Sequence, residues 1–143
     1  MKQINDQLKI PAEVSQLDRV LAFLESALEE GGCPTKTSMQ ICVSAEEIFV
    51  NIANYAYPEQ GGQCTMDIEV SADTEKGTGD VSLTVTDSGK EFNPLEREDP
   101  DIHLSAEDRQ IGGLGIWMVK QSMDYVEYRY EDAQNKITFG KKW

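Results

Sequence analysis

The most informative stretch of this chain spans residues 41–57 and reads ICVSAEEIFVNIANYAY. Twelve of its 17 residues are apolar, which is typical of a helix that is buried on most of its sides. Pro34 stands where a helix can begin, and Pro58 where one must end. We therefore expect one helix from Pro34 to Tyr57.

The polar residues of this helix fall on one line. Gln40, Ser44, Glu47, Asn51 and Asn54 follow one another at steps of four, three, four and three residues, which places them on a single helical face. One interpretation is the solvent-facing side of an amphipathic helix. The other is a site, because short amides are costly to bury unpaired and supply oxygen ligands for a hard cation. The line is narrow and rich in Asn and Ser, so we favour a site in which Glu47 and Asn51 surround one Mg²⁺ ion or one water molecule.

The patterns on either side of this helix predict a two-layer fold. Apolar residues recur at helical spacing from Val14 until Gly31, and they alternate at strand spacing in two later runs. Helices come early, strands late, and a further helix lies near the end. We expect an α/β (α+β) two-layer sandwich, with helices on one face of a mixed, mostly antiparallel sheet, formed by one domain over residues 1–143. The other expected elements are strands Gln7–Ile10, Cys64–Ala72, Val81–Thr86, Tyr125–Tyr130 and Lys136–Phe139, and a helix Gly112–Met123.

Two glycine-containing elements follow these strands. Asp87 comes just after a strand-like run and is followed by Gly89. This pattern is often a plain turn, but it also suits an exocyclic amine on a flat ring that approaches the glycine backbone. Residues 112–115 read GGLG and open an apolar helix. They are either a flexible helix start or a phosphate site made of backbone N–H groups at the positive helix end.

Known nucleotide fingerprints do not explain these glycines. The chain contains no GxxxxGK[ST] loop, so it is not a P-loop protein. The GxGxxG fingerprint is incomplete and follows a polar stretch instead of a strand, so dinucleotide binding of the Rossmann type is excluded too.

A polar stretch of about twenty residues separates the two glycine elements and ends at Ile111. It holds two prolines and seven acidic residues, and it shows neither helical nor strand period. Loops of this length in a compact domain are often functional lids, so we expect residues 91–111 to order when a ligand binds. Arg109 is the cation in this loop that we expect to contact phosphate. The alternative, a solvated charge beside Glu107 and Asp108, stays open.

The charge of the chain excludes several classes of partner. Thirteen Lys and Arg face 26 Asp and Glu, which gives a net charge of −13. Nucleic acids and anionic membranes bind clustered Lys and Arg, so neither is an expected partner. Three cysteines without CxxC spacing predict neither a disulfide framework nor a zinc site, and they favour the reducing cytoplasm.

The order of the motifs is more specific than any one of them. A Glu-x-x-x-Asn helix, an Asp-x-Gly after a strand, a long loop and a Gly-x-Gly that opens a helix follow one another along nearly the whole chain. This order resembles the histidine-kinase-like ATPase (GHKL) fold with its Bergerat nucleotide site. Within it, the chain resembles the small anti-sigma-factor serine/threonine kinases of bacterial partner-switching systems. The matching segments are residues 45–57 (AEEIFVNIANYAY), 85–94 (VTDSGKEFNP) and 112–116 (GGLGI).

The resemblance implies ATP and Mg²⁺ as cofactors and gives the matching residues roles. Glu47 would be the catalytic carboxylate that polarises the attacking hydroxyl, and Asn51 would bind the nucleotide through Mg²⁺. Asp87 would accept a hydrogen bond from the adenine amine, with Gly89 beside the ring. Gly113 and Gly115 would let the loop and the helix N-terminus close around the phosphates.

Two functions then remain in competition. The first is a protein kinase that passes the γ-phosphoryl group of ATP to Ser or Thr of a small anti-anti-sigma-type antagonist. The second is a nucleotide-gated binding module that sequesters a sigma factor or another regulator without transfer. The presence of Glu47 favours the kinase, because a passive switch does not need it. A histidine-kinase catalytic domain is disfavoured, since the chain's single histidine, His103, lies in the long loop. A sigma factor and a second copy of the chain are further candidate partners.

Overall fold

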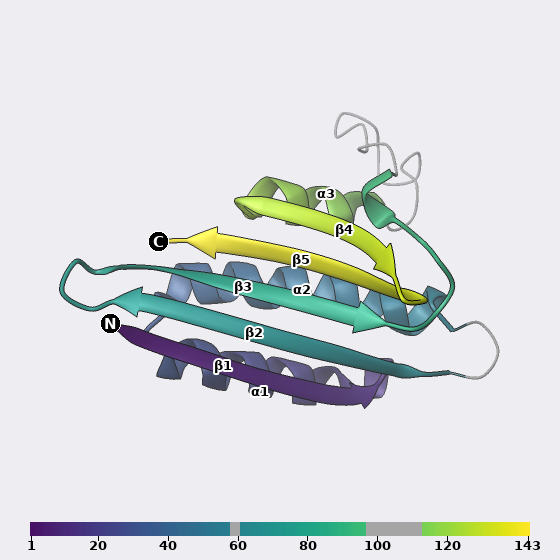
Figure 1. Cartoon of the computed structure of the whole chain (residues 1–143), viewed down its shortest axis with the longest axis horizontal. Helices are drawn as coiled ribbons and strands as arrows, with labels where there is room; N and C mark the ends of the chain where they lie inside the picture. The colour runs from purple at the N-terminus through teal and green to yellow at the C-terminus, as the bar shows by residue number, and fades with distance from the viewer. Residues whose placement is uncertain (58–60, 97–112) are drawn as a thin grey trace.

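The computed structural model describes residues 1–57, 61–96 and 113–143, which form a five-stranded sheet with helices on one face (Figure 1). The predicted two-layer sandwich is confirmed. In chain order the elements are β1 (Lys2–Pro11), η1 (Val14–Gln16), α1 (Leu17–Glu30), α2 (Thr35–Tyr55), β2 (Gln63–Asp73), β3 (Thr78–Asp87), η2 (Pro94–Glu96), α3 (Gly113–Ser122), β4 (Tyr125–Glu131) and β5 (Gln134–Lys142).

The sheet has the strand order β1-β2-β3-β5-β4, and each neighbouring pair of these strands is antiparallel. The mostly antiparallel sheet is therefore confirmed, and the described strands include no parallel pair. In the chain, α3 lies between β3 and β4, and β4 occupies the edge of the sheet. From that edge β5 returns beside β3, so the end of β3 and the start of β5 meet at one end of the sheet.

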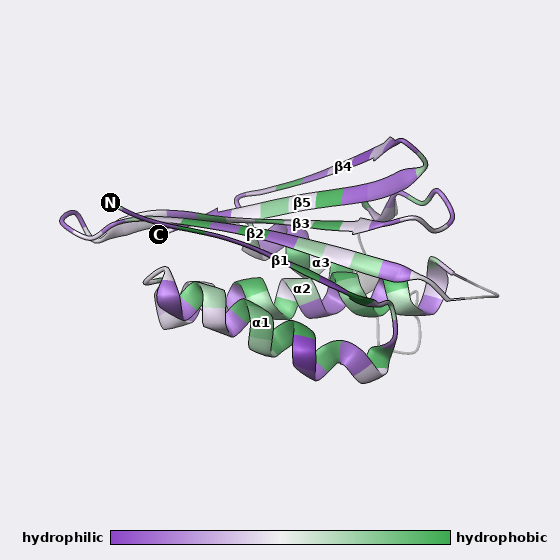
Figure 2. Ribbon diagram, turned by 60° about the horizontal axis from the view of Figure 1, so that its bottom comes forward, coloured by the Kyte–Doolittle hydropathy of each residue, from purple (hydrophilic) through white to green (hydrophobic). Residues whose placement is uncertain are grey.

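The core lies between the sheet and the helix layer. Alternate residues of β2 are buried, and the same alternation continues in β3. Figure 2 shows α1 and α2 lying against one face of the sheet, while no helix of the described residues covers the opposite face. On α2 the buried apolar residues are Ile41, Ala45, Ile48, Phe49 and Ile52.

Helix α2 is enclosed on most of its sides. One of its faces packs on the sheet, and α1 and α3 lie beside it in the same layer. From Ile41 to Tyr55 only Val43, Asn54 and Tyr55 are exposed, so burial on most sides is confirmed; Val43 and Tyr55 are 45% and 58% exposed. These two apolar residues lie at the two sites described below.

Element boundaries differ from the prediction where tertiary pairing decides them. β1 begins at Lys2, five residues earlier than expected, because it pairs with β2 over its whole length. β5 begins at Gln134 because Asp132 and Ala133 both adopt positive φ and form a two-residue hairpin turn. Alanine is not a typical residue of such turns, so the sequence does not mark it. The first helix starts with the 3₁₀ turn η1, and η2 lies in the stretch expected to have no helix.

Within residues 1–57, 61–96 and 113–143, no helix is long and apolar enough to cross a membrane.

Candidate functional site

The polar line on α2 passes from the protein interior to solvent. Ser44 is buried, Glu47 and Asn51 are half-buried, and Asn54 is exposed. The interpretation as a solvent face holds for Asn54, and the interpretation as a site stays a prediction for Glu47 and Asn51. The outer end is a solvent face, whereas the middle borders two hollows on the molecular surface.

One hollow lies where the C-terminal end of α2 meets the ends of β3 and β5. It brings together Asn51 and Asp87, two residues that the sequence pattern linked only by order. Its volume is about 40 Å³, room for about one water molecule. We call it the Asp87 pocket, and its lining consists of Asn51, Ile52, Tyr55, Ala56, Asp87, Lys90, Phe92, Pro94, Asn135 and Ile137.

Asp87 is a buried carboxylate at the last position of β3, with 4% of its surface exposed. Its Oδ1 accepts hydrogen bonds from the backbone N–H of Gly89 (2.9 Å) and from Nδ2 of Asn135 (3.0 Å). Burial raises the pKa of Asp87, and these two hydrogen bonds oppose the rise. Among the described residues no donor is placed on Oδ2. The pocket thus holds a buried acceptor with capacity for a ligand donor.

Asn135 is a site residue that the sequence analysis missed. It lies opposite Asp87 in the β3–β5 pairing and is 4% exposed. Its Nδ2 also donates to the carbonyl of Lys90 (2.9 Å), and its Oδ1 accepts from the Tyr128 hydroxyl (2.6 Å) and the Phe92 N–H (3.1 Å). The amide therefore fixes Asp87 and the chain that follows β3. No motif marks it, because its value comes from a register across two strands.

We expect Asn135→Ala to lower the free energy of unfolding by about 2 kcal/mol, because it leaves several buried polar groups without partners. The same change should weaken ligand binding at Asp87, whose carboxylate loses its side-chain donor. Urea denaturation measures the first effect. The neighbouring Gln134→Ala variant is the control, since the side chain of Gln134 makes only a 3.5 Å contact with Ser88. Equal stability of the two variants would contradict the role of Asn135.

Gly89 allows the chain after β3 to pack on the end of α2. A Cβ atom at this position would collide with the backbone carbonyl of Ala56. Next to it, the N–H of Lys90 donates to that same carbonyl (2.9 Å). The Tyr57 hydroxyl completes this junction, because it accepts from the Ser88 N–H (2.7 Å) and donates to the Gln63 carbonyl (2.7 Å). The glycine is thus required by packing, while its expected place beside a ring stays a prediction.

The substitution Gly89→Ala should lower stability by about 1–3 kcal/mol, because backbone has to move to admit the methyl group. Thermal unfolding followed by circular dichroism checks this. Ser88→Ala, one residue earlier and with no added atom to accommodate, should change stability far less. A Gly89→Ala protein as stable as the wild type would show that the junction with Ala56 yields freely.

Glu47 lies against the first turn of α3. A Cβ atom on Gly115 would overlap Oε2 of Glu47, so the carboxylate would have to turn aside to admit any larger residue there. Gly113 is the first residue of α3. The structure therefore places the predicted catalytic carboxylate next to the predicted phosphate-binding helix start. Arg109 and His103 lie outside the described residues, as does most of the expected lid, residues 97–111.

The oxygen donors on α2 suit Mg²⁺, which takes few protein ligands and completes its shell with water and substrate phosphates. Asn51 offers an amide oxygen and Glu47 a carboxylate one turn away. The described residues contain no group of three or more His, Cys, Asp or Glu side chains that would hold a metal ion by itself. The donor set therefore fits a magnesium ion that arrives with a phosphate ligand.

A comparison with known protein families agrees with this geometry. The sequence profile of the histidine kinase-like ATPase domain matches residues 10–141. The chain belongs to this family. The family match and the two-layer architecture confirm the resemblance inferred from the motif order.

Named relatives of this ATPase-domain chain are protein kinases. The chain is 22% identical over 138 residues to the serine/threonine-protein kinase BtrW of Bordetella bronchiseptica, covering 96% of this chain and 94% of the relative. It is 22% identical over 135 residues to the serine-protein kinase RsbW of Listeria monocytogenes, covering 91% and 82%. These names agree with the kinase expected from the motifs.

A solved structure has the same fold. The RsbU and RsbW domains of Rv1364c from Mycobacterium tuberculosis match with a TM-score of 0.60 and 16% identity over 95% of this chain. The chain spans about a third (32%) of that solved chain. This likeness supports the fold of the ATPase domain.

Proposed function

We propose that this chain is an ATP-dependent serine/threonine protein kinase that phosphorylates a small antagonist protein in a bacterial partner-switching system. The observation that carries the proposal is the buried Asp87 carboxylate, which shares a pocket with Asn51 one helical turn from Glu47. An acceptor for a base amine at the end of β3 thus lies beside a metal ligand on α2, and a general base follows one turn further along that helix.

Adenine enters the Asp87 pocket, where the carboxylate accepts a hydrogen bond from the exocyclic amine. The pocket in its present form is smaller than a purine ring. Entry therefore requires its rim to open, and two rim residues, Tyr55 and Phe92, are 58% and 48% exposed and free of the core. Asn135 holds the carboxylate in place during this change.

The phosphates extend along α2 toward its N-terminus. Nine residues separate Ala56 in the pocket from Glu47, a rise of about 14 Å at 1.5 Å per residue. An extended nucleoside triphosphate has a similar length. Its terminal phosphate then reaches the N-terminal turn of α3, where Gly113 and Gly115 supply backbone N–H groups. Arg109, which lies outside the described residues, is the cation that the sequence proposes for phosphate contact.

Glu47 acts as the general base of the transfer. It takes the proton from an incoming Ser or Thr hydroxyl as that oxygen bonds to the γ-phosphorus, while the bond from the γ-phosphorus to the β–γ bridging oxygen breaks and ADP leaves. Asn51 orients the nucleotide from the same face of the helix. A bound Mg²⁺ ion supplies charge neutralisation on the phosphate oxygens.

The net charge of −13 bears on the partner. An acidic surface suits a basic regulator such as a sigma factor, and it disfavours direct binding to nucleic acid or an anionic membrane. We place the protein in the cytoplasm, where ATP and such regulators are found. A second copy of the chain is a further candidate partner.

The test is a transfer assay. The purified full chain is incubated with Mg²⁺ and γ-labelled ATP, together with antagonist-class proteins encoded next to it. We expect label on Ser or Thr of one such protein. ATP binding with no transfer to any of them would favour the nucleotide-gated binding module instead.

A further inference from the structure

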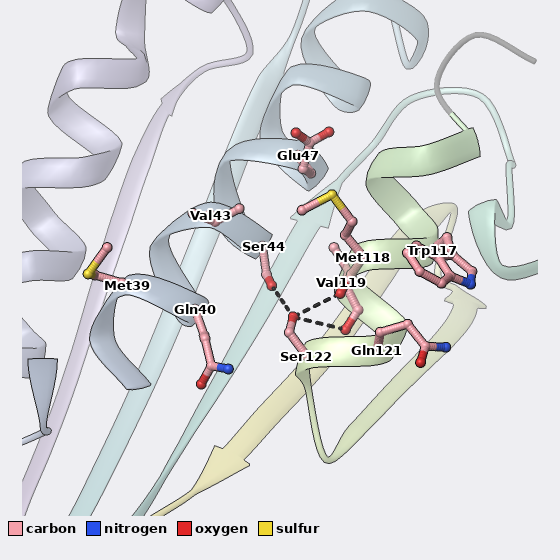
Figure 3. Close-up of a pocket in the computed structure, with 10 residues that line it drawn as sticks. All are labelled: Met39, Gln40, Val43, Ser44, Glu47, Trp117, Met118, Val119, Gln121 and Ser122. Carbon is pink, nitrogen blue, oxygen red and sulfur yellow. Dashed lines mark hydrogen bonds between the residues drawn. The ribbon is translucent and has the colours of Figure 1, made fainter. Parts of the chain in front are cut away.

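A second hollow lies between α2 and α3, beyond Glu47 (Figure 3). This α2–α3 groove has a volume of about 510 Å³, and its surface is mainly apolar. Glu47 is the one ionisable side chain among its described lining residues. These are Met39, Gln40, Val43, Ser44, Glu47, Trp117, Met118, Val119, Gln121 and Ser122.

A contact between two serine hydroxyls forms the floor of the α2–α3 groove, and apolar side chains are exposed at its rim. The hydroxyls of Ser44 and Ser122 are 3.5 Å apart and join the two helices, and Ser44 is only 2% exposed. At the rim, Met39, Val43 and Met118 are 63%, 45% and 44% exposed. Apolar side chains that stand around a hollow without packing into the core are typical of a recognition surface, and methionine adapts to varied partners.

The order of features along α2 indicates what this groove admits. The Asp87 pocket lies at the C-terminal end of α2, followed toward the N-terminus by Asn51, then Glu47, then the groove. In phosphoryl transfer, the attacking oxygen and the leaving oxygen lie in line on opposite sides of the phosphorus. With the nucleotide on one side of Glu47, the acceptor hydroxyl has to come from the other side. That side is the groove.

We propose that the α2–α3 groove docks the acceptor segment of the protein substrate, a linear and uncharged stretch that carries Ser or Thr to Glu47. This proposal rests on the kinase function proposed above. Apolar residues next to the acceptor contact the exposed rim, while Gln40 and Gln121 offer amides to the segment's backbone. An acidic segment is excluded, because Glu47 and the net charge of −13 repel it.

The probe is a peptide library with one fixed central Ser and varied flanking residues, offered with Mg²⁺ and γ-labelled ATP to the full chain. We expect the wild type to prefer apolar flanks. Val43→Gln and Met118→Gln should each raise KM for the best peptide about tenfold, because each removes the burial of one apolar side chain. The kcat at saturating peptide and the Kd for ATP should stay unchanged. Val14→Gln is the matched control, since Val14 is 50% exposed on η1, away from the groove.

Trp117 gives a readout that is independent of transfer. The chain has two tryptophans, so Trp143→Phe leaves Trp117 in the groove as the single indole. Peptide added to this variant in the presence of ADP should change the emission of Trp117. Adding Val43→Gln to the same protein should shift the titration to about tenfold higher peptide concentration.

The remaining outcomes of these experiments separate a failure of the docking proposal from a failure of the proposed kinase function. Unchanged KM in both groove variants, or a preference for charged flanks, would overturn the docking site. Transfer to a protein but to no peptide would overturn docking of a linear segment and leave the kinase standing. Transfer to neither would refute the kinase, and the docking proposal with it.

Discussion

Glu47→Gln is expected to reduce phosphoryl transfer by about 10²–10⁴-fold while ATP binds nearly as well as to the wild type. Glutamine keeps the length of the side chain, so the close packing of Glu47 against Gly115 is retained. What disappears is the ability to accept a proton from the attacking hydroxyl, which matters only in the transition state. Single-turnover transfer to the acceptor protein and calorimetric Kd for ATP, measured on the same preparations, separate the two effects.

Glu46→Gln is the matched control for this experiment. Glu46 is the preceding residue on α2 and has the same charge, but it lies off the polar line that carries Glu47 and Asn51. Its replacement should leave transfer close to the wild-type rate. Transfer by Glu47→Gln at the wild-type rate would mean that another group is the base.

Asp87→Asn is expected to weaken ATP binding by about 10- to 150-fold, the value of a hydrogen bond to a charged group of about 1.5–3 kcal/mol. The carboxylate accepts from the adenine amine, whereas it would face the guanine carbonyl as one acceptor against another. The wild type should therefore prefer ATP to GTP, and the variant should lose this preference because its amide donates to guanine. Calorimetry with both nucleotides checks the result. Unchanged ATP affinity in the variant would remove Asp87 from base recognition.

Asp87→Asn should raise the free energy of unfolding at pH 7, although it weakens ATP binding. Burial raises the pKa of Asp87 above its ordinary value of 3.8, so the folded protein binds this proton more tightly than the unfolded chain. The contribution of the Asp87 carboxyl to the free energy of unfolding is greatest below its ordinary pKa of 3.8. It falls as the pH rises toward the raised pKa of the folded state. In Asp87→Asn the amide oxygen still accepts from Gly89 and Asn135, and the side chain has no charge to bury, so the variant avoids that loss. Urea unfolding should show a relative gain for the variant at pH 7 that shrinks as the pH falls toward the ordinary pKa.

A relative gain that is independent of pH would show that the carboxylate ionises as freely in the folded protein as in the unfolded chain. A loss of stability at pH 7 would mean that the charge itself holds the turn after β3. The nucleotide titrations concern function and the urea unfolding concerns folding, so affinity and stability are measured separately on the same variant.

Local patterns in the sequence predicted most of the elements and most of the residues proposed for the site. The polar line placed Glu47 and Asn51 on one face of α2, because side chains three and four residues apart share a helical face. Alternation placed Asp87 at the end of a buried strand. The order of motifs identified the ATPase family that the profile match confirms. These properties depend on neighbours in the chain, and the sequence displays them directly.

Only the tertiary structure decided how these elements meet. The strand register sets Asn135 against Asp87, although 48 residues separate them and neither residue type is unusual. The collision that an added Cβ at Gly115 would have with Glu47, and the opening of the α2–α3 groove, arise from the packing of two helices. Such contacts are set by the shapes of distant side chains across a shared core, which local periodicity does not encode.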